Sequence, residues 1–296
     1  MPAIEYALWS DTRIDLRVPP AAVSGPLSVV QDGRMSNALD FTVTNGKIYH
    51  VDPNNPNALD LINDGSATEP WRTIGRAYAT LQPGDTLYIH TSVYAESIAP
   101  PRGGTADAPI LYKAFPGDTV VLDGGALTQP ADGIRIDGQA HPGIGHVIVA
   151  DITVRNMDLG AQLIGPAHDL GLFGIESDAC RGGIESTNAS TLTLAQCVAR
   201  SNTAFGVALK GTAAAIDVLD CRSLSNRDVG GTGNGFHTDP GIARPRLIRC
   251  DASFNVGSGF DLSSGPAQLL ECEATANRDG IRLGRDATVR NAVVYN

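Results

Sequence analysis

The clearest pattern of apolar and polar positions lies between Leu192 and Asn296, where one unit is repeated five times. Each unit has a cysteine or asparagine followed five residues later by an asparagine, and the units recur every 19 to 29 residues. A period near two dozen residues is typical of a solenoid, in which each repeat forms one coil. The five pairs are Cys197/Asn202, Cys221/Asn226, Cys250/Asn255, Cys272/Asn277 and Asn291/Asn296.

Apolar and polar residues alternate around the first fixed position of each unit. The residues two before and two after it are apolar or small, as Leu219 and Ser223 are around Cys221, while its direct neighbours are mostly polar or charged. This period of two predicts a strand with one buried face. A second short strand is predicted after the asparagine in four of the units, at residues 206–209, 235–238, 259–262 and 280–283.

Two or more strands per repeat, with no helical spacing between them, predict an all-β chain folded as a parallel β-helix. Asp151 and Asn156 show the same five-residue relation, so the repeat is expected to start before residue 192. In residues 73–81, apolar side chains at helical spacing lie between Pro70 and Pro83, which predicts a short amphipathic helix. We expect this helix to cover the first coil, because a solenoid end needs a cap.

The chain before this helix reads differently. Residues 4–43 form short alternating segments separated by turns such as Asp32-Gly33, and residues 52–65 are rich in Asn and Pro. The predicted organisation is a partial β-sandwich over residues 1–44, a linker over 45–64 and the β-helix over 65–296. We expect both ends to be incomplete, the C-terminal one because the sequence stops within a coil at Asn296.

Composition narrows the possible partners. The formal net charge is −10, which argues against nucleic acid as a partner, and an acidic polymer would need a locally positive surface or bridging cations. The 33 glycines and 18 prolines suit a turn-rich β protein. The sequence has no apolar run that predicts membrane insertion, and its start lacks the basic and apolar segments of a signal peptide.

The five cysteines are too few for a disulfide scaffold. Four of them occupy the same inward position of the repeat and are expected to be a stack of buried thiols, although stacked coils also bring Cα atoms within disulfide range. Cys180 lies outside this pattern. No zinc site is expected, because the paired C-x-x-C spacing does not occur.

Several short motifs follow one another from residue 65 onward. They are Gly-Ser at 65–66, Pro-Trp-Arg-Thr-Ile at 70–74, Pro-Gly-Asp-Thr-Leu-Tyr-Ile at 83–89, Gly-Gly-Thr at 103–105, Pro-Ile at 109–110, Pro-Gly at 116–117, Gly-Asn-Gly-Phe at 233–236, Cys-Asp-Ala at 250–252 and Gly-Phe-Asp at 259–261. With these motifs the sequence resembles the pectate-lyase-like right-handed β-helix proteins, and among them the family-nine polysaccharide lyases. The resemblance implies a right-handed parallel β-helix.

The N-terminal segment carries a second set of matching residues, at 9–14, 18–19, 24–25, 36–37 and 41–43. With these it resembles the C-terminal half of an IPT/TIG domain, a small immunoglobulin-like β-sandwich. Such domains are spacers or contact surfaces, so no chemistry is expected in this part of the chain.

The family resemblance implies a catalytic position. In family-nine lyases a lysine directly after the Gly-Asn-Gly-Phe segment is the base, and here His237 holds that position. The preceding coil of those enzymes carries an aspartate cluster that binds calcium, whereas residues 202–208 contain no carboxylate. If calcium takes part here, Asp239 and Asp261 are the available ligands.

The outward positions of the second strand predict where chemistry could occur. In order they are Arg135, Glu185, Ala208, His237, Asp261 and Arg282, and a parallel column two residues further on includes Lys210 and Asp239. His237 and Asp261 should lie one coil apart, close enough for the carboxylate to hold the imidazole. The longer segment 227–234 is expected to wall a groove beside them.

Lyases and epimerases of uronate polymers both begin by removing the proton on C5, which requires a base and a cation that neutralises the C6 carboxylate. We assign the base to His237, supported by Asp261. Lys210 or Arg282 would bind the substrate carboxylate, and Asp239 or Glu185 would be a proton partner.

Three functions stay open from the sequence. The first is a secreted or cell-surface polysaccharide lyase acting as a monomer on an acidic polysaccharide. The second is a non-catalytic adhesin or carbohydrate-binding module, since alternating charges on outward columns are often plain solvated surface. The third is a uronan C5-epimerase, because Gly-Phe-His-Thr-Asp-Pro at 235–240 weakly resembles the Asp-Pro-His region of alginate epimerases.

Overall fold

A computed structural model describes residues 6–9, 14–16, 18, 22–41, 43, 45–228 and 233–295. The chain divides into two compact units, Met1–Asn45 and Gly46–Asn296. No helix in the described parts of the chain is long and apolar enough to cross a lipid bilayer.

The described part of the first unit consists of antiparallel strand pairs. They are β1 (Tyr6–Trp9) with β2 (Ile14–Leu16), β3 (Gly25–Leu27) with β6 (Leu39–Phe41), and β4 (Val30–Gln31) with β5 (Arg34–Met35). Several residues behind the IPT/TIG resemblance, among them those at 10–13 and 42, lie outside the described residues. The immunoglobulin-like sandwich therefore stays a prediction.

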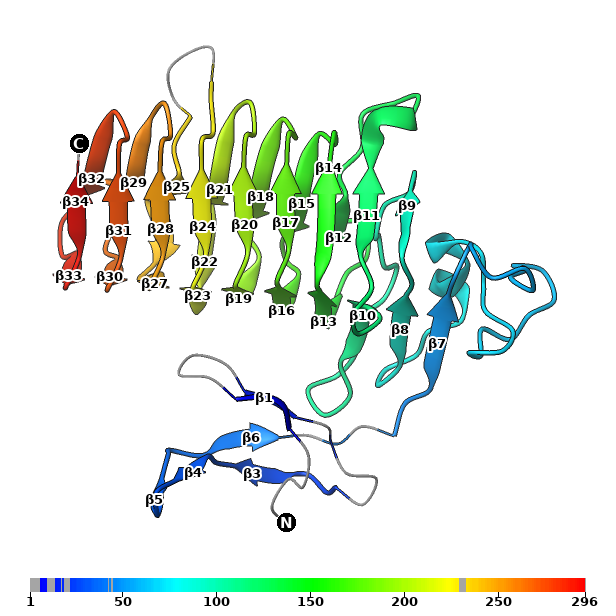
Figure 1. Cartoon of the computed structure of the whole chain (residues 1–296). Coiled ribbons are helices and arrows are strands. Elements are labelled where there is room, and N and C mark those ends of the chain that lie inside the picture. Colours follow the sequence, from blue (N-terminus) through cyan, green and yellow to red (C-terminus); the bar gives the residue numbers. More distant parts are fainter. Residues whose placement is uncertain are drawn as a thin grey trace. The chain divides into compact units, whose positions relative to one another are not determined.

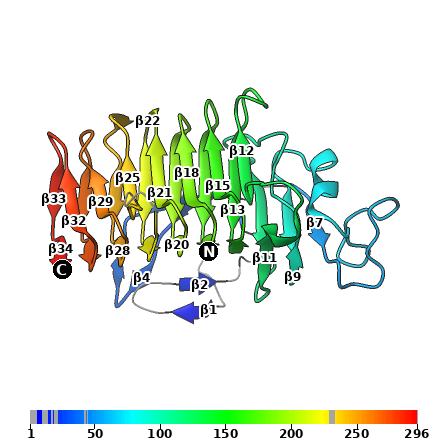
Figure 2. The ribbon, with the colours of Figure 1, turned by 90° about the horizontal axis from the view of Figure 1, so that it is seen from above.

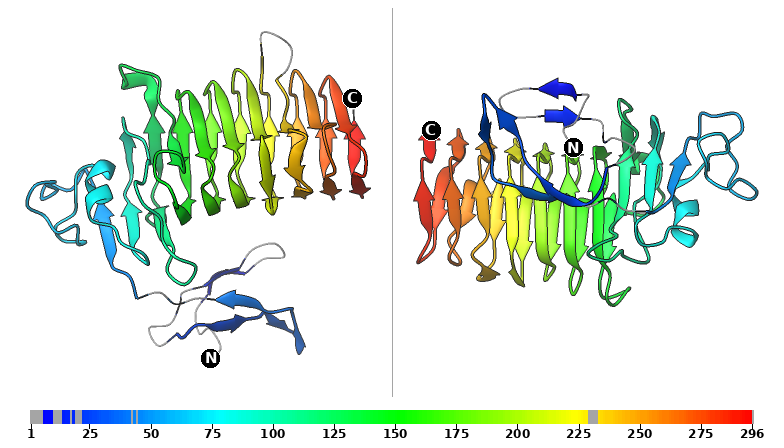
Figure 3. Two further views of the ribbon diagram at one scale, coloured as in Figure 1. Left: turned by 180° about the vertical axis from the view of Figure 1, so that it is seen from behind. Right: turned by 90° about the horizontal axis from the view of Figure 1, so that it is seen from below.

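The second unit is the predicted parallel β-helix, which is confirmed. Its chain winds through three parallel sheets, and strands that are one coil apart in sequence lie side by side (Figure 1). Views from above, from behind and from below show the coils stacked in sequence order (Figures 2 and 3). Outward residues at one position of the coil therefore form columns with a spacing of about 4.8 Å.

In each of the three sheets, neighbouring strands come from successive coils. The ten-stranded sheet contains β33 (Thr288–Arg290), β30 (Gln268–Leu270), β27 (Arg246–Ile248), β23 (Ile216–Leu219), β19 (Ser190–Ala195), β16 (His168–Phe173), β13 (Gly145–Ala150), β10 (Ile110–Ala114), β8 (Thr86–Ile89) and β7 (Ile48–Val51). The nine-stranded sheet contains β34 (Val293–Tyr295), β31 (Glu273–Thr275), β28 (Asp251–Ser253), β24 (Arg222–Leu224), β20 (Val198–Arg200), β17 (Glu176–Asp178), β14 (Ile152–Arg155), β11 (Val120–Asp123) and β9 (Ser92–Tyr94). The seven-stranded sheet contains β12 (Ile134–Asp137), β15 (Leu159–Ile164), β18 (Gly182–Thr187), β21 (Phe205–Lys210), β25 (Phe236–Thr238), β29 (Ser258–Leu262) and β32 (Asp279–Leu283). A short parallel pair, β22 (Thr212–Ala214) with β26 (Gly241–Ala243), forms a separate two-stranded sheet.

The boundary predicted at residue 65 differs from the structure. β7 pairs in parallel with β8, so residues 48–51 already belong to the ten-stranded sheet. Trp71 is fully buried, stacks on Tyr49 with ring centroids 5.0 Å apart, and donates its indole N–H to the carbonyl of Asn63. The segment predicted as a linker is thus fixed to the β-helix, because its backbone supplies partners for a buried aromatic residue.

The capping helix exists, but it is a 3₁₀-helix, η1 (Ile74–Ala79). Its apolar residues pack into the core as the spacing predicted: Ile74, Ala77 and Leu81 are buried, and Tyr78 is partly buried against the same cluster. A 3₁₀-helix suits so short a segment, since this geometry is used in pieces of a few residues. A second 3₁₀-helix, η2 (Gly124–Ala126), follows β11.

The segment around each repeated cysteine is two strands joined by a corner, which corrects the prediction of one strand. The residue before each cysteine has a left-handed backbone, with φ between 51° and 56°, at Gln196, Asp220, Arg249 and Glu271. This corner reverses which residues face inward. Val218 is therefore buried where Leu219 was expected, whereas Ser223 after the corner is buried as predicted.

A second left-handed residue precedes the asparagine in the four units that have a cysteine, at Ser201, Ser225, Phe254 and Ala276. The fixed interval of five residues is thus the distance between two corners of the coil. Asp151 and Asn156 are themselves left-handed, with φ of 59° and 55°. They occupy the corner positions rather than the cysteine and asparagine positions, one residue away from the expected match.

The repeated asparagines form a buried ladder. The side-chain oxygen of Asn226 accepts from both the backbone N–H and the side-chain amide of Asn202, at 3.1 and 3.0 Å, and Asn255 and Asn277 repeat this arrangement one coil further each. Cys180 occupies the same position at the start of the ladder, because its backbone N–H donates to Asn202 at 3.0 Å. Its place outside the cysteine pattern is thereby explained.

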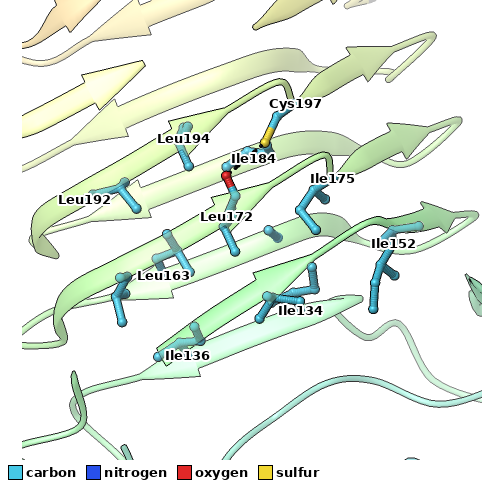
Figure 4. Packing of buried hydrophobic residues seen from close by; sticks show 14 of the residues in the cluster. Ile134, Ile136, Ile152, Leu163, Leu172, Ile175, Ile184, Leu192, Leu194 and Cys197 are labelled. Carbon is cyan, nitrogen blue, oxygen red and sulfur yellow. Dashed lines mark hydrogen bonds between the residues drawn. The ribbon is translucent and has the colours of Figure 1, made fainter. Parts of the chain in front are cut away.

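All five cysteines are buried free thiols, as expected for the four that repeat. The thiol of Cys197 contacts the carbonyl of Leu172 in the preceding coil at 3.4 Å, and equivalent contacts occur at Cys221, Cys250 and Cys272. Figure 4 shows this contact among the Ile and Leu side chains that fill the interior between the sheets. The thiols thus fill the corner of the core as small hydrophobic groups.

Candidate active site

The predicted outward column lies on the seven-stranded sheet, and the register confirms its order. Gln162 is an additional member between Arg135 and Glu185, which the sequence pattern missed because residues 157–190 fit the repeat poorly. The members are Arg135, Gln162, Glu185, Ala208, His237, Asp261 and Arg282.

The core fixes the two central members from behind. Phe236 and Phe260 are both buried and stack with ring centroids 5.0 Å apart and an interplanar angle of 6°. Since successive side chains of a strand point to opposite faces, this stack turns His237 and Asp261 outward. The imidazole and the carboxylate therefore lie on adjacent coils, as expected.

The nearest carboxylate to His237 is nevertheless that of Asp239. His237 Nε2 lies 3.1 Å from Asp239 Oδ1, whereas His237 Nδ1 lies 3.8 Å from Asp261 Oδ2, beyond hydrogen-bond distance. The expected direct support of the imidazole by Asp261 is thus corrected: the hydrogen bond joins the imidazole to Asp239, two residues further along the chain and just past the end of β25. Asp239 is itself fixed, because its Oδ2 accepts the backbone N–H of Gly211 at 3.0 Å.

His237 Nδ1 is buried without a hydrogen-bond partner, although 29% of the side chain is exposed. An unpaired buried nitrogen is unusual, because desolvation without a hydrogen bond costs about 1–3 kcal/mol. A shift of less than one ångström would bring Asp261 into contact with Nδ1. In that arrangement Asp261 would accept Nδ1–H, and Nε2 would accept a proton once it separates from Asp239.

Asp261 is held by its own surroundings. Its Oδ1 accepts the hydroxyl of Ser263 at 2.6 Å, and its Oδ2 accepts the side-chain amide of Asn234 at 3.3 Å. Asn234 also accepts the backbone N–H of Ser258 at 2.9 Å, so it joins the loop to β29. Asn234 was noted only as part of the Gly-Asn-Gly-Phe motif, and no periodicity could have assigned it this contact.

The two candidate cations differ in their availability. Lys210 Nζ lies 2.6 Å from Glu185 Oε2 and 5.0 Å from the ring centroid of Phe205, so an ion pair and a cation–π contact hold it. Arg282 is 3.8 Å from Asp261 Oδ2, and 52% of its side chain is exposed. Arg282 is therefore the more accessible cation for a carboxylate ligand, whereas Lys210 is held in its ion pair with Glu185.

Arg135, at the other end of the column, is part of a compact ionic cluster. It contacts Asp132 and Asp137 at 2.9 and 2.7 Å and also donates to Gln162. Burial raises the pKa of Asp132 despite this arginine. Burial would also raise the pKa of Asp137, but hydrogen bonds from Ala140 N–H, Arg135 and Gln139 N–H outweigh it and lower that pKa.

The residues present do not fit the calcium cluster that the family resemblance implies. Asn202 is committed to the ladder, and His237 lies between the carboxylates of Asp239 and Asp261. Calcium takes six to eight oxygen ligands, whereas this arrangement places an imidazole at the centre. Residues 229–232, the middle of the segment expected to wall the groove, lie outside the described residues.

Comparisons with known proteins agree with this architecture. The family model described as the Pel9A-like, right-handed β-helix region matches residues 49–290. The pectate lyase PEL9 of Emericella nidulans is 26% identical over 205 residues, which cover 67% of this chain and 46% of that protein. The chain thus spans about half the length of this curated relative.

Solved structures show the same fold. A crystal structure of pectate lyase Pel9A has a TM-score of 0.59 at 16% identity, covering 85% of this chain and 80% of that one. An alginate lyase from Paenibacillus sp. str. FPU-7 has a TM-score of 0.61 at 14% identity, covering 74% of this chain and 83% of that one. At these identities the likeness concerns the fold.

Proposed function

The chain belongs to the Pel9A-like family of right-handed β-helix regions, and from this premise we propose that it cleaves an acidic, uronate-containing polysaccharide by β-elimination. The single observation that carries the proposal is the placement of His237 between the carboxylates of Asp239 and Asp261 on the outer face of the seven-stranded sheet. An extended outer face suits a polymer, which can lie across several coils.

The proposed reaction assigns a role to each group. His237 separates from Asp239 when the polymer binds and accepts the C5 proton through Nε2, and Asp261 stabilises the imidazolium that results. The electron pair of the C5–H bond first moves toward the C6 carboxylate, whose charge Arg282 neutralises, and Lys210 contributes if it leaves Glu185. The C4–O bond then breaks and a C4–C5 double bond forms. The leaving oxygen takes up the proton that was removed from C5, which Asp239 passes on from the imidazolium.

The test is cleavage of polygalacturonate and alginate, followed by the ultraviolet absorbance of the new double bond, with and without added calcium. His237→Gln keeps a polar side chain of similar size but removes the base, so product formation should fall at least about 100-fold. Arg246→Gln is the matched control, since Arg246 is paired with Asp217 on the outer face of the ten-stranded sheet. If the wild type forms product and His237→Gln forms it at the same rate, that result would falsify this assignment of the base.

Binding without cleavage is the second candidate function, and one observation favours it: Lys210 is already paired with Glu185 at 2.6 Å. A surface module of this kind would bind the polymer in an electrophoretic mobility assay and give no unsaturated product with any uronan. An epimerase would also give no double bond, but it would incorporate solvent deuterium at C5. Unsaturated product, binding without product, and deuterium incorporation at C5 therefore distinguish the lyase, the binding module and the epimerase.

We also propose that the protein works outside the cell or on its surface, where such polymers occur, and that it acts as a monomer. Fractionation of the producing culture tests the first statement. Light scattering of the purified protein tests the second, with a dimer mass as the contrary result.

A further inference from the structure

A second cluster of reactive side chains lies on the ten-stranded sheet, apart from the column that holds His237. His146 comes from β13, and His168 and Asp169 come from β16, the neighbouring strand (Figure 1). Within the described residues, one donor atom from each of these three side chains lies within 4.8 Å of the other two. All three side chains are half-buried, with 24 to 38% of each exposed.

The backbone explains why they meet. His146 and Asp169 are both left-handed, with φ of 52° and 51°, and the register places them opposite each other on adjacent coils. A left-handed residue locally breaks the alternation of the strand. As a result, the consecutive residues His168 and Asp169 are both half-buried before the buried Leu170, instead of one pointing inward.

The packing of His168 depends on a glycine. A side-chain Cβ at Gly145, the partner of His168 in the adjacent coil, would lie 2.5 Å from the imidazole ring. Real Cβ atoms do not approach so closely, so only glycine lets the ring lie over this backbone. His168 Nδ1 then reaches Asp169 Oδ2 at 2.7 Å, and His146 Nε2 lies 3.7 Å from the same oxygen.

We propose that His146, His168 and Asp169 bind a divalent transition-metal ion of the zinc class. Two imidazoles and one carboxylate are the ligand set of a three-residue zinc site that keeps a position for water or a ligand. Imidazole nitrogen favours zinc, copper or nickel over calcium and magnesium, which prefer oxygen. The site therefore differs in metal class from the calcium considered for Asp239 and Asp261.

The absence of C-x-x-C pairs argued against zinc in the sequence, but this site uses no cysteine. A full coil separates His146 from the consecutive His168 and Asp169, so no short motif marks all three. Only the stacking of coils brings the ligands together. The proposal does not depend on the function assigned to His237.

The test is metal binding by the whole protein, measured by isothermal titration with Zn²⁺ and by the visible absorption of bound Co²⁺. We expect one equivalent of Zn²⁺ and a weakening of at least about 100-fold in His146→Gln and in Asp169→Asn, since even outer-shell substitutions cost 10- to 100-fold. His90→Gln is the matched control, because His90 belongs to another half-buried His–His–Asp arrangement, with His50 and Asp118.

Circular dichroism checks that each variant keeps its β structure, and Asp169→Asn preserves the shape of the side chain. Wild-type protein that binds no Zn²⁺ would overturn the proposal and leave His168 and Asp169 as a simple hydrogen-bonded pair. Undiminished binding in both His146→Gln and Asp169→Asn would equally overturn it. Loss of binding in His90→Gln alone would place the metal at the other histidine pair.

Discussion

At the scale of the residue, the imidazole of His50 shows how burial sets a titration on the outer face of the ten-stranded sheet. Its Nδ1 lies 3.0 Å from His90 Nε2, and His90 Nδ1 lies 2.9 Å from Asp118 Oδ2. The rings of His50 and His90 stack with centroids 5.3 Å apart, and Phe115 stacks on His90. Burial lowers the pKa of His50, and the neighbouring His90 lowers it further against the opposing charge of Asp52.

A lowered pKa makes stability depend on pH. Below about pH 6.5 the unfolded chain binds a proton at residue 50 that the folded chain does not, so the free energy of unfolding falls as the pH falls toward the folded pKa. We expect His50→Gln to reduce the loss of stability between about pH 6.5 and pH 5. Urea midpoints measured across this range test the prediction, and an unchanged slope would contradict it.

The outward positions of the candidate-site residues were predictable, but the contacts that their side chains make were not. Alternation placed His237 outward and the repeat placed Asp261 beside it, which the register confirms. That Asp239, rather than Asp261, touches the imidazole depends on side-chain rotamers, which a periodic pattern does not contain. Asn234 was missed for the same reason, since it acts from a loop.

At the scale of the element, the corners of the coil depend on non-glycine residues with left-handed backbone. Such a conformation costs about 1 kcal/mol for a residue with a Cβ, and glycine avoids this cost. Ala276 is exposed at a corner with φ 51°, whereas the exposed Ala243 lies in β26. The same substitution should therefore have opposite effects at the two positions.

We expect Ala276→Gly to raise the free energy of unfolding by up to about 1 kcal/mol, because it relieves the left-handed strain. Ala243→Gly should lower it by about 0.5–1 kcal/mol, since glycine is unfavourable within a strand. Paired urea denaturation curves give both values. A loss of stability in both variants would mean that the corner is not strained.

The corners also explain how far the sequence predicted the elements. The interval of five residues was visible, and so was the period of two, but the change of inward face at Asp220 was not. A left-handed aspartate reads in sequence like any polar strand residue. The predicted strand therefore ran through a point where the structure turns.

At the scale of the whole molecule, the net charge of −10 opposes the approach of an anionic polymer. Salt screens this repulsion, because the Debye length falls from about 30 Å at 0.01 M to about 8 Å at 0.15 M ionic strength. We expect the association rate with polygalacturonate to rise over this range, the reverse of a basic nucleic-acid-binding protein. Stopped-flow binding at several salt concentrations tests this, and a steep fall with salt would show that local cations dominate.

The overall architecture was predictable because stacked coils repeat one pattern, and the β-helix is accordingly confirmed. The ligands of the proposed metal site were not predictable, since His168 and Asp169 belong to residues 157–190, which fit the repeat poorly. Their proximity is a property of coil stacking rather than of any local motif.

The asparagine ladder constrains one corner of each coil that contributes to it. Asn226 and Asn255 fix their own corners, yet Gly235 comes nine positions after Asn226, whereas Gly259 comes only four positions after Asn255. Extra chain is therefore accommodated at the exit from the asparagine corner without disturbing the stack. That exit is a natural insertion point, and loops from related β-helices could be transplanted there to redesign ligand preference while the scaffold stays intact.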